Sequence, residues 1–368
     1  MPPTTRPAPA DGAIPPFVPH PWIRGPHLQT IVARLWSWPR ARLDSTYAEV
    51  DVGGGDRISV LESTPDGWRP GDPAAILVHG LGGCARSPYI VRIGRRLVDE
   101  CRTRVVRMNL RGAGSGFGAA RSYYHSGKTD DLRRVAGWTA RRAPGSPIAL
   151  VGFSLGANLV LKLAGEAADD PLPQLDAVVA ANPPVDLEAC CRAIQDPRNR
   201  LYDRNFVRLL RGEVGRLHAR FPDLGPVDLA SARTLLAFDE AYTAPRNGFR
   251  DARDYYQQCS AARWVGRIQV PGLVIHAADD PFIPAEAFDS VPFPAHLTFE
   301  MVPHGGHLGF WSHRPWDGSR RWLDARIVRW LQSRRDVVPS PRHLPPGPRE
   351  IPVGLPTQEL LHHAERNR

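Results

Sequence analysis

The chain has 368 residues, 42% of them hydrophobic, which is enough to bury the core of one enlarged domain. Its formal charge of +9 is almost entirely arginine, because Lys128 and Lys162 are the only lysines. The arginines are spread along the chain without a clustered basic run, so we attribute them to compositional bias and expect no nucleic-acid partner. The net positive charge is weak support for contact with a membrane surface, which we keep as an alternative.

The cysteines and the ends of the chain point to a soluble cytoplasmic protein. No apolar run approaches the ~20 residues of a membrane-spanning helix, and the N-terminus lacks the apolar centre of a secretory signal. The cysteines are odd in number and have no C-x-x-C spacing, so we expect reduced thiols. They are Cys84, Cys101, Cys190, Cys191 and Cys259.

Composition divides the chain into three parts. Residues 1–20 are rich in Pro, Ala and Thr, and we expect them to lack fixed structure. Residues 21–334 form the folded domain, and we expect its first segment, up to Thr30, to pack on the rest. Residues 335–368 are rich in Pro and Arg and are expected to form a flexible tail.

Within the domain, short apolar runs alternate with amphipathic ones, which is typical of an α/β fold with a mostly parallel sheet and helices on both faces. The predicted strands are 47–52, 58–61, 74–79, 105–110, 148–152, 177–181, 273–276 and 297–302. The first two should form an antiparallel pair. The predicted helices are 88–98, 132–142, 155–167 and 322–331. Residues 185–265 lack strand-like runs, so we expect a helical insertion that caps the carboxyl ends of the strands.

A serine stands between the strand 148–152 and the helix that follows, in the sequence Gly152-Phe153-Ser154-Leu155-Gly156. G-x-S-x-G at a strand-to-helix turn is the signature of a nucleophile elbow, where the turn is so tight that glycines are needed two residues either side of the serine. A serine hydroxyl is a poor nucleophile at neutral pH, so it needs a base and a carboxylate that orients the base.

Both partners are predicted downstream, each just past the end of a strand. Asp280 is the candidate acid, because D-P-x-x-P fixes a turn directly after it, and Asp279 is the alternative. His307 is the candidate base, because the two glycines before it let the loop approach Ser154, and His304 is the weaker candidate. The order Ser, Asp, His is that of the α/β-hydrolase fold. His304 and His307 have no third ligand at a suitable spacing, so we expect no metal site.

An acyl-transfer site also needs two backbone N–H groups that face the developing oxyanion. The amide of Leu155 is one candidate, because it follows the serine at the start of a helix. The amide of Leu81, in the segment His79-Gly80-Leu81-Gly82-Gly83, is the other. The glycine-rich stretch 109–116 matches neither nucleotide fingerprint, so we interpret it as a structural loop.

These segments give the chain a family resemblance over about residues 15–333. The segments that carry it are Pro26-His27-Leu28-Gln29-Thr30, 79–83 with Ser87-Pro88-Tyr89, 109–112, Gly152 to Asn158, Asp279-Asp280-Pro281 and 305–310. The chain resembles the YheT-like α/β-hydrolases, also called α/β-hydrolase family 4. The resemblance implies a Ser-Asp-His hydrolase of carboxylic esters without metal or organic cofactor. The tail after Arg335 has no match in the family.

The sequence thus predicts a serine hydrolase that cleaves small-molecule acyl esters through an acyl-enzyme. We expect short- or medium-chain acyl esters or acylglycerols as substrates. Acyl transfer to an alcohol, or a phospholipase or lipase at a membrane surface, is the alternative. A binding protein on a hydrolase scaffold is disfavoured, because it would lack a member of the Ser154, Asp280 and His307 set.

Overall fold

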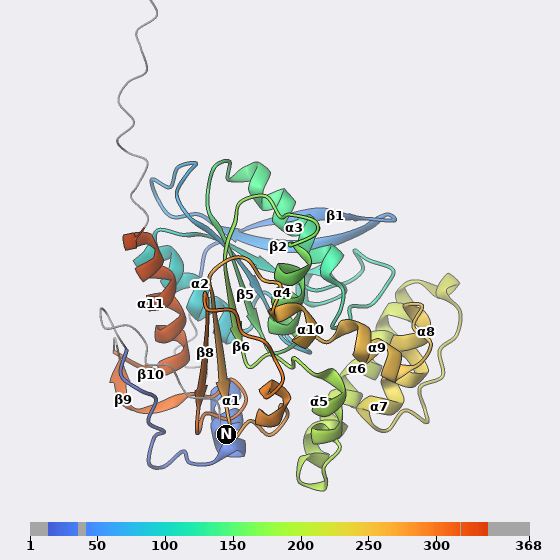
Figure 1. The fold of residues 1–368 in the computed structure, drawn as a ribbon. Coiled ribbons are helices and arrows are strands. Elements are labelled where there is room, and N and C mark those ends of the chain that lie inside the picture. Colours follow the sequence, from blue (N-terminus) through green and yellow to red (C-terminus); the bar gives the residue numbers. More distant parts are fainter. Residues whose placement is uncertain (1–13, 36–41, 317, 338–368) are drawn as a thin grey trace, which may run out of the picture.

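An eight-stranded, mostly parallel sheet forms the centre of the computed structural model, which describes residues 14–35, 42–316 and 318–337 (Figure 1). The strand order is β1-β2-β4-β3-β5-β6-β7-β8. β2 runs antiparallel to β1 and β4, and the other pairings are parallel. The strands are Thr46–Gly53 (β1), Asp56–Ser63 (β2), Ala74–Val78 (β3), Arg104–Met108 (β4), Ile148–Phe153 (β5), Leu175–Ala181 (β6), Gly272–Ala277 (β7) and Leu297–Val302 (β8). The predicted α/β architecture is confirmed.

The chain changes direction across the sheet at β3, which has β4 on one side and β5 on the other. In a doubly wound sheet such a point leaves a crevice outside the carboxyl ends of the strands. The segment 79–83 follows β3 and Ser154 follows β5, so both open into this crevice. β5 is buried along its whole length, as expected of a parallel strand that reads as a continuous apolar run.

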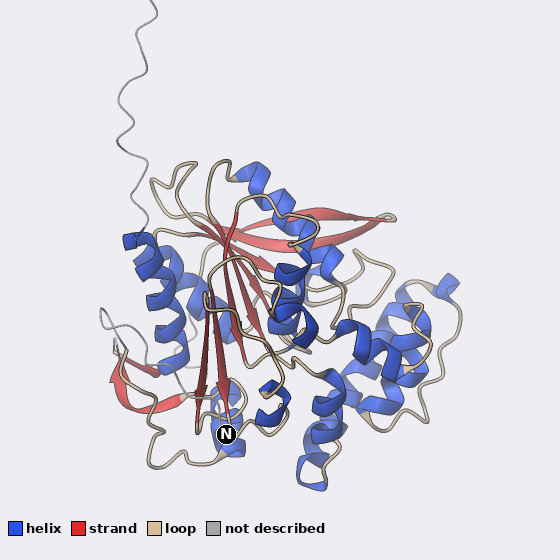
Figure 2. Cartoon of the chain, viewed as in Figure 1, coloured by secondary structure: helices blue, strands red, loops and turns tan. Residues whose placement is uncertain are grey.

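Helices cover both faces of the sheet (Figure 2). α2 and α11 pack together on one face, where Leu77 and Val151 meet them. α3 and α4 cover the other face, where Ile76 and Leu150 point. The bounds are Pro88–Cys101 (α2), Thr129–Arg142 (α3), Leu155–Glu166 (α4) and Trp322–Val337 (α11). The four predicted helices are present, and α11 continues to Val337.

A group of helices connects β6 to β7 and includes the predicted insertion (Figure 1). They are Leu187–Ile194 (α5), Arg200–Arg220 (α6), Leu235–Phe238 (α7), Ala244–Arg246 (α8), Ala252–Cys259 (α9) and Ala262–Val265 (α10). A π-helical turn, Asp239–Thr243, joins α7 to α8. In α6 the buried residues Val207, Leu210, Val214 and Leu217 recur at helical spacing, so one side of the helix packs on the domain.

The N-terminal segment of the domain differs from the expectation. Residues 14–20 pack on the domain: Phe17 is buried with its ring centroid 5.6 Å from those of Phe310 and Trp322, and Pro19 forms a β-bridge with Ser312. The predicted disorder is therefore wrong for this stretch, because a single aromatic anchor outweighs its proline-rich composition. Residues 1–13 lie outside the described part.

Two short elements near the ends of the domain were not predicted. α1 (Pro26–Leu35) carries the segment expected to pack on the domain. A separate hairpin of β9 (Trp311–Trp316) and β10 (Ser319–Arg321) leads into α11. The expected start of the tail at residue 335 is wrong by a few residues, since α11 ends at Val337, and residues 338–368 lie outside the described part.

Candidate active site

Ser154 occupies the turn between β5 and α4 with a backbone φ of +53° and ψ of −123°. Such a positive φ is strained for a residue other than glycine, so the packing around the turn has to enforce it. A Cβ on Gly152 would lie 2.3 Å from the Gly156 carbonyl oxygen, and one on Gly156 would lie 2.4 Å from that of Val78. Glycine is therefore required at both positions, and the turn holds the Ser154 hydroxyl at its tip.

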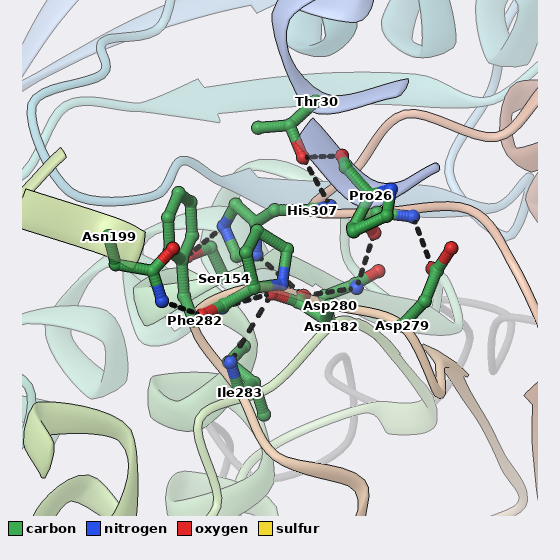
Figure 3. Close-up of polar contacts among 12 residues, drawn as sticks. Pro26, Thr30, Ser154, Asn182, Asn199, Asp279, Asp280, Phe282, Ile283 and His307 are labelled. Carbon is green, nitrogen blue, oxygen red and sulfur yellow. Dashed lines mark hydrogen bonds and ion pairs between the residues drawn. The ribbon is translucent and has the colours of Figure 1, made fainter. Parts of the chain in front are cut away.

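The loops after β7 and β8 bring the predicted partners to this hydroxyl (Figure 3). His307 Nε2 lies 2.9 Å from Ser154 Oγ, and His307 Nδ1 lies 2.8 Å from Asp280 Oδ2. An ionised carboxylate only accepts hydrogen bonds, so Nδ1 carries the proton of the neutral imidazole. Nε2 is then free to accept the serine proton.

Asp280 is enclosed by donors. Its side chain is fully buried, and Oδ1 accepts hydrogen bonds from the amides of Phe282 (2.8 Å) and Ile283 (3.3 Å). Oδ2 also accepts from the Asn182 side-chain amide at 2.6 Å. Burial alone raises the pKa of Asp280, but the charge and hydrogen bond of His307 outweigh it and leave the pKa below its usual value. The carboxylate therefore stays ionised next to the imidazole.

The alternatives for acid and base lie beside this chain of hydrogen bonds. Asp279 Oδ1 accepts from the Gly306 amide at 2.8 Å, and its other oxygen lies 3.4 Å from His304 Nδ1. Asp279 thus fastens the loop that carries His307, while Asp280 contacts the imidazole itself. The geometry favours Asp280 and His307 over the alternatives.

α1 supports the same loop from outside the sheet. Thr30 Oγ1 accepts from the His307 amide at 2.9 Å and donates to the Pro26 carbonyl at 2.7 Å (Figure 3). The Gln29 side chain is fully buried, and its Oε1 accepts from the Trp311 amide at 2.7 Å. The P-H-L-Q-T segment therefore anchors the His307 loop, a role that its sequence alone does not reveal.

The segment 79–83 lies against Ser154, and two tyrosine hydroxyls bind its backbone. The sequence alone does not indicate this role for either tyrosine. The Gly80 amide donates to the Tyr89 hydroxyl at 3.0 Å, and the Gly82 amide donates to the Tyr124 hydroxyl at 2.9 Å. Among the described residues, the amides of Leu81 and Leu155 have no hydrogen-bond acceptor. Both amides are thus free to donate to a bound group, and their role as oxyanion donors stays a prediction.

The helices between β6 and β7, α5 to α10, which we call the cap, contact this segment through α6. A Cβ on Gly82 would lie 2.8 Å from Leu209 Cδ2, so the two are in close contact. Tyr123, whose ring lies tilted against that of Tyr124 with centroids 4.4 Å apart, donates a hydrogen bond to Glu213 of α6. The segment 79–83 therefore contacts the cap as well as the sheet.

A cavity of about 880 Å³ lies between the cap and the sheet and reaches Ser154 and His307. Its volume falls in the range of small-molecule sites. Apolar side chains dominate the lining, among them Leu155, Phe206 and Phe238. The cavity therefore offers the seryl hydroxyl an acyl-sized apolar space.

The remaining candidates have structural contacts. Asn109 of the glycine-rich stretch accepts from the Ala85 amide at 2.7 Å and donates to Ser59 at 2.9 Å, and Arg111 pairs with buried Asp131 at 2.6 Å. These bonds support the structural interpretation of that loop.

The described residues hold no group of three or more His, Cys, Asp or Glu side chains that could share a metal ion. No described helix combines the length and the apolar composition needed to cross a bilayer.

Comparison with known proteins agrees with this fold. A family profile described as "alpha/beta hydrolase fold" matches residues 73–314. The chain is 33% identical over 322 residues to YheT of Escherichia coli (strain K12), covering 86% of this chain and 92% of that protein. It is 27% identical over 278 residues to the monoacylglycerol lipase of Saccharomyces cerevisiae, covering 72% of this chain and 60% of the lipase.

Among solved structures, the 2,6-dihydroxy-pseudo-oxynicotine hydrolase superposes with a TM-score of 0.52 at 19% identity, covering 83% of this chain and 71% of that chain. At this level of identity the likeness concerns the fold alone. The extent of the match to YheT and to the family profile is decisive. The chain therefore belongs to the α/β-hydrolase fold family and is a YheT-like member of it.

Proposed function

We propose that this protein is a carboxylic ester hydrolase that forms an acyl-enzyme on Ser154. The observation that carries the proposal is the continuous chain of hydrogen bonds from Ser154 Oγ through His307 to Asp280, with distances of 2.9 and 2.8 Å. The family and the ester-cleaving monoacylglycerol lipase among the relatives support ester chemistry.

In this mechanism Ser154 Oγ attacks the ester carbonyl while His307 Nε2 takes the hydroxyl proton. Asp280 stays ionised and stabilises the imidazolium. The amides of Leu81 and Leu155 donate to the oxygen that gains charge, where each such donor is worth roughly 10²–10³ in rate. The imidazolium then gives its proton to the leaving alcohol, and a water activated by His307 releases the acid.

The apolar lining of the cavity supports an acyl group as the part of the substrate that it encloses. Phe206 and Phe282 pack edge-to-face with centroids 5.6 Å apart, and the Phe282 ring lies 4.9 Å from that of His307. An acyl chain that binds beside these rings would move its apolar surface out of water, which favours binding. We propose short- or medium-chain acyl esters or acylglycerols as substrates.

The test is Ser154→Ala assayed with p-nitrophenyl acetate and butyrate. We expect turnover to fall by about 10⁴-fold or more, because the substitution removes the nucleophile and leaves only binding and oxyanion stabilisation. A serine-directed fluorophosphonate should label the native protein and spare the variant. Unchanged turnover, or a label on any other residue, would refute the assignment.

Acyl transfer to an alcohol is a second candidate, favoured by the apolar lining of the cavity, which suits an alcohol better than water. The acyl-enzyme is common to both reactions. Adding ethanol or glycerol to the butyrate assay and measuring the ratio of new ester to free acid separates them.

A further inference from the structure

The exposed side of the cap helix α6 carries only positive charge. Its exposed residues are Arg200, Leu201, Arg204, Arg208, Arg211, Gly212, Gly215, Arg216, Ala219 and Arg220. Four of these arginines are spaced by four, four and three residues, which places them on one face of the helix. We call Arg200, Arg204, Arg208 and Arg211 the arginine face.

None of the four forms an ion pair within the described residues, although arginines elsewhere are paired. On α2, Arg95 meets Asp99 at 3.1 Å and Arg96 meets Glu100 at 2.6 Å, each one turn away. Compositional bias would add arginine to both helices, yet Arg95 and Arg96 of α2 have carboxylate partners, and the arginine face of α6 has none among the described residues. The expectation of diffuse charge is therefore wrong for α6. Its arginines lie three or four residues apart in the sequence, so they form a cluster on the helix without forming a continuous basic run.

The arginine face begins at the mouth of the cavity. Of the residues that line the cavity, five are themselves exposed and so mark where it opens: His27, Ile31, Pro88, Arg198 and Leu201. Arg198 and Leu201 flank Arg200, and the Leu201 side chain is 78% exposed. Any surface that touches the arginine face therefore lies next to the entrance to Ser154.

α1 forms the opposite edge of the mouth and presents apolar side chains to solvent. Leu28, Ile31 and Leu35 are 42%, 42% and 76% exposed, and their spacing of three and four residues places them on one face. We call them the apolar stripe. α1 contacts α6 directly, because His27 stacks on Tyr202 with ring centroids 5.6 Å apart. The stripe and the arginine face thus border one opening.

We propose that these two surfaces dock the protein on an anionic lipid bilayer, so that a lipid ester enters the cavity from the membrane. The inference rests on the proposed esterase function and names the source of its substrate. Arginines complement anionic head groups, and apolar side chains beside them enter the boundary between head groups and acyl chains. A nucleic acid would match the arginines but would leave the apolar stripe unmatched.

The experiment measures binding to extruded vesicles with the full-length Ser154→Ala protein, which cannot consume the lipid. Flotation compares vesicles of phosphatidylcholine with vesicles that also contain phosphatidylglycerol, at low and at physiological salt. We expect binding to the phosphatidylglycerol vesicles that weakens as salt screens the arginines. Because no turnover is involved, a failure here leaves the esterase proposal untouched, and the ester assay tests that proposal separately.

The decisive variant adds Arg204→Gln, Arg208→Gln and Arg211→Gln to Ser154→Ala. We expect roughly 100-fold weaker binding, because each arginine at an anionic surface contributes about fivefold. The matched control removes the same charge from exposed, paired arginines through Arg57→Gln, Arg95→Gln and Arg250→Gln, and it should bind like its parent. With Ser154 intact, the first triple variant should hydrolyse soluble butyrate ester at the native rate.

A second variant, Leu28→Ser with Leu35→Ser, tests the apolar stripe with residues that lie outside the cavity lining. It should weaken vesicle binding by roughly tenfold while leaving the salt dependence in place. The proposal is overturned by equal losses in the two arginine triples, by no binding to anionic vesicles, or by tighter binding to duplex DNA than to vesicles.

Discussion

Two adjacent carboxylates, Asp279 and Asp280, contact the loop that carries His307, the first at the Gly306 amide and the second at the imidazole. We predict that Asp280→Asn lowers kcat by about 10³-fold or more, because an amide in place of the carboxylate neither fixes the Nδ1–H tautomer nor stabilises an imidazolium. Asp279→Asn keeps an oxygen for the Gly306 amide and should cost less than about tenfold. Steady-state kinetics of both variants measure the difference. A larger loss in the Asp279 variant would contradict the assignment.

Tyr124 contacts the segment 79–83 through its hydroxyl, which accepts a hydrogen bond from the Gly82 amide at 2.9 Å. We expect Tyr124 to affect the reaction through this segment. Its ring is buried, so Tyr124→Phe leaves that amide without an acceptor while the ring still fills its place. We predict that kcat falls about tenfold or more with KM unchanged. The Leu81 amide would lose its alignment with the substrate oxygen, and this alignment matters only in the transition state, where that oxygen gains charge. Tyr47→Phe, on the exposed β1, is the control. An equal change in KM would point to a binding role instead.

At the scale of an element, the π-helical turn of the cap buries a carboxylate whose side-chain hydrogen-bond partners are neutral hydroxyl groups. Asp239 accepts hydrogen bonds from Thr243 and Tyr256, each at 2.7 Å, and burial raises its pKa to about 6. The unfolded chain ionises near 3.8, so the folded state loses stability as the pH rises from about 4 to 6. Above that range the folded protein carries the full cost of a buried ion.

Asp239→Asn removes this titration. We predict that, relative to the native protein, the variant gains about 1 kcal/mol in free energy of unfolding between pH 5 and pH 8, where the last unit of the shift is lost. Urea unfolding at the two pH values measures it. The exposed Asp66→Asn should show no such pH-dependent gain. A gain that shrinks towards pH 8 would contradict the raised pKa.

Across the whole molecule, the sheet and the central polar residues are predictable because their signals are local. Each buried parallel strand is a short apolar run, and Ser154, Asp280 and His307 each follow such a run, so they meet at one edge of the sheet. The apolar residues that recur at helical spacing in α1 are exposed, so they do not indicate where the helix contacts the domain, and the β9–β10 hairpin contains no short apolar run. Their positions were therefore not predictable.

The residues that hold the candidate catalytic residues and the segment 79–83 in place could not be predicted either, because their partners are distant in the sequence. Thr30 meets the His307 amide across 277 residues of sequence, Asn182 meets Asp280 across 98, and Tyr124 meets Gly82 across 42. Nothing in the residues next to each one in the chain indicates its partner. Their geometry follows from the fold.

Residues 14–20 pack on the loop before β9 and on the start of α11, and this contact can be tested with neighbouring residues. Phe17 is buried at 7% exposure against Phe310 and Trp322, whereas Val18 is 57% exposed. We predict that Phe17→Ala lowers the free energy of unfolding by about 3 kcal/mol, from lost burial and the cavity left behind. Val18→Ala should change it by less than about 0.5 kcal/mol. Because Phe310 also packs against Gly305 in the loop of His307, Phe17→Ala should lower kcat as well, and equal stabilities of the two variants would show that residues 14–20 do not anchor the fold.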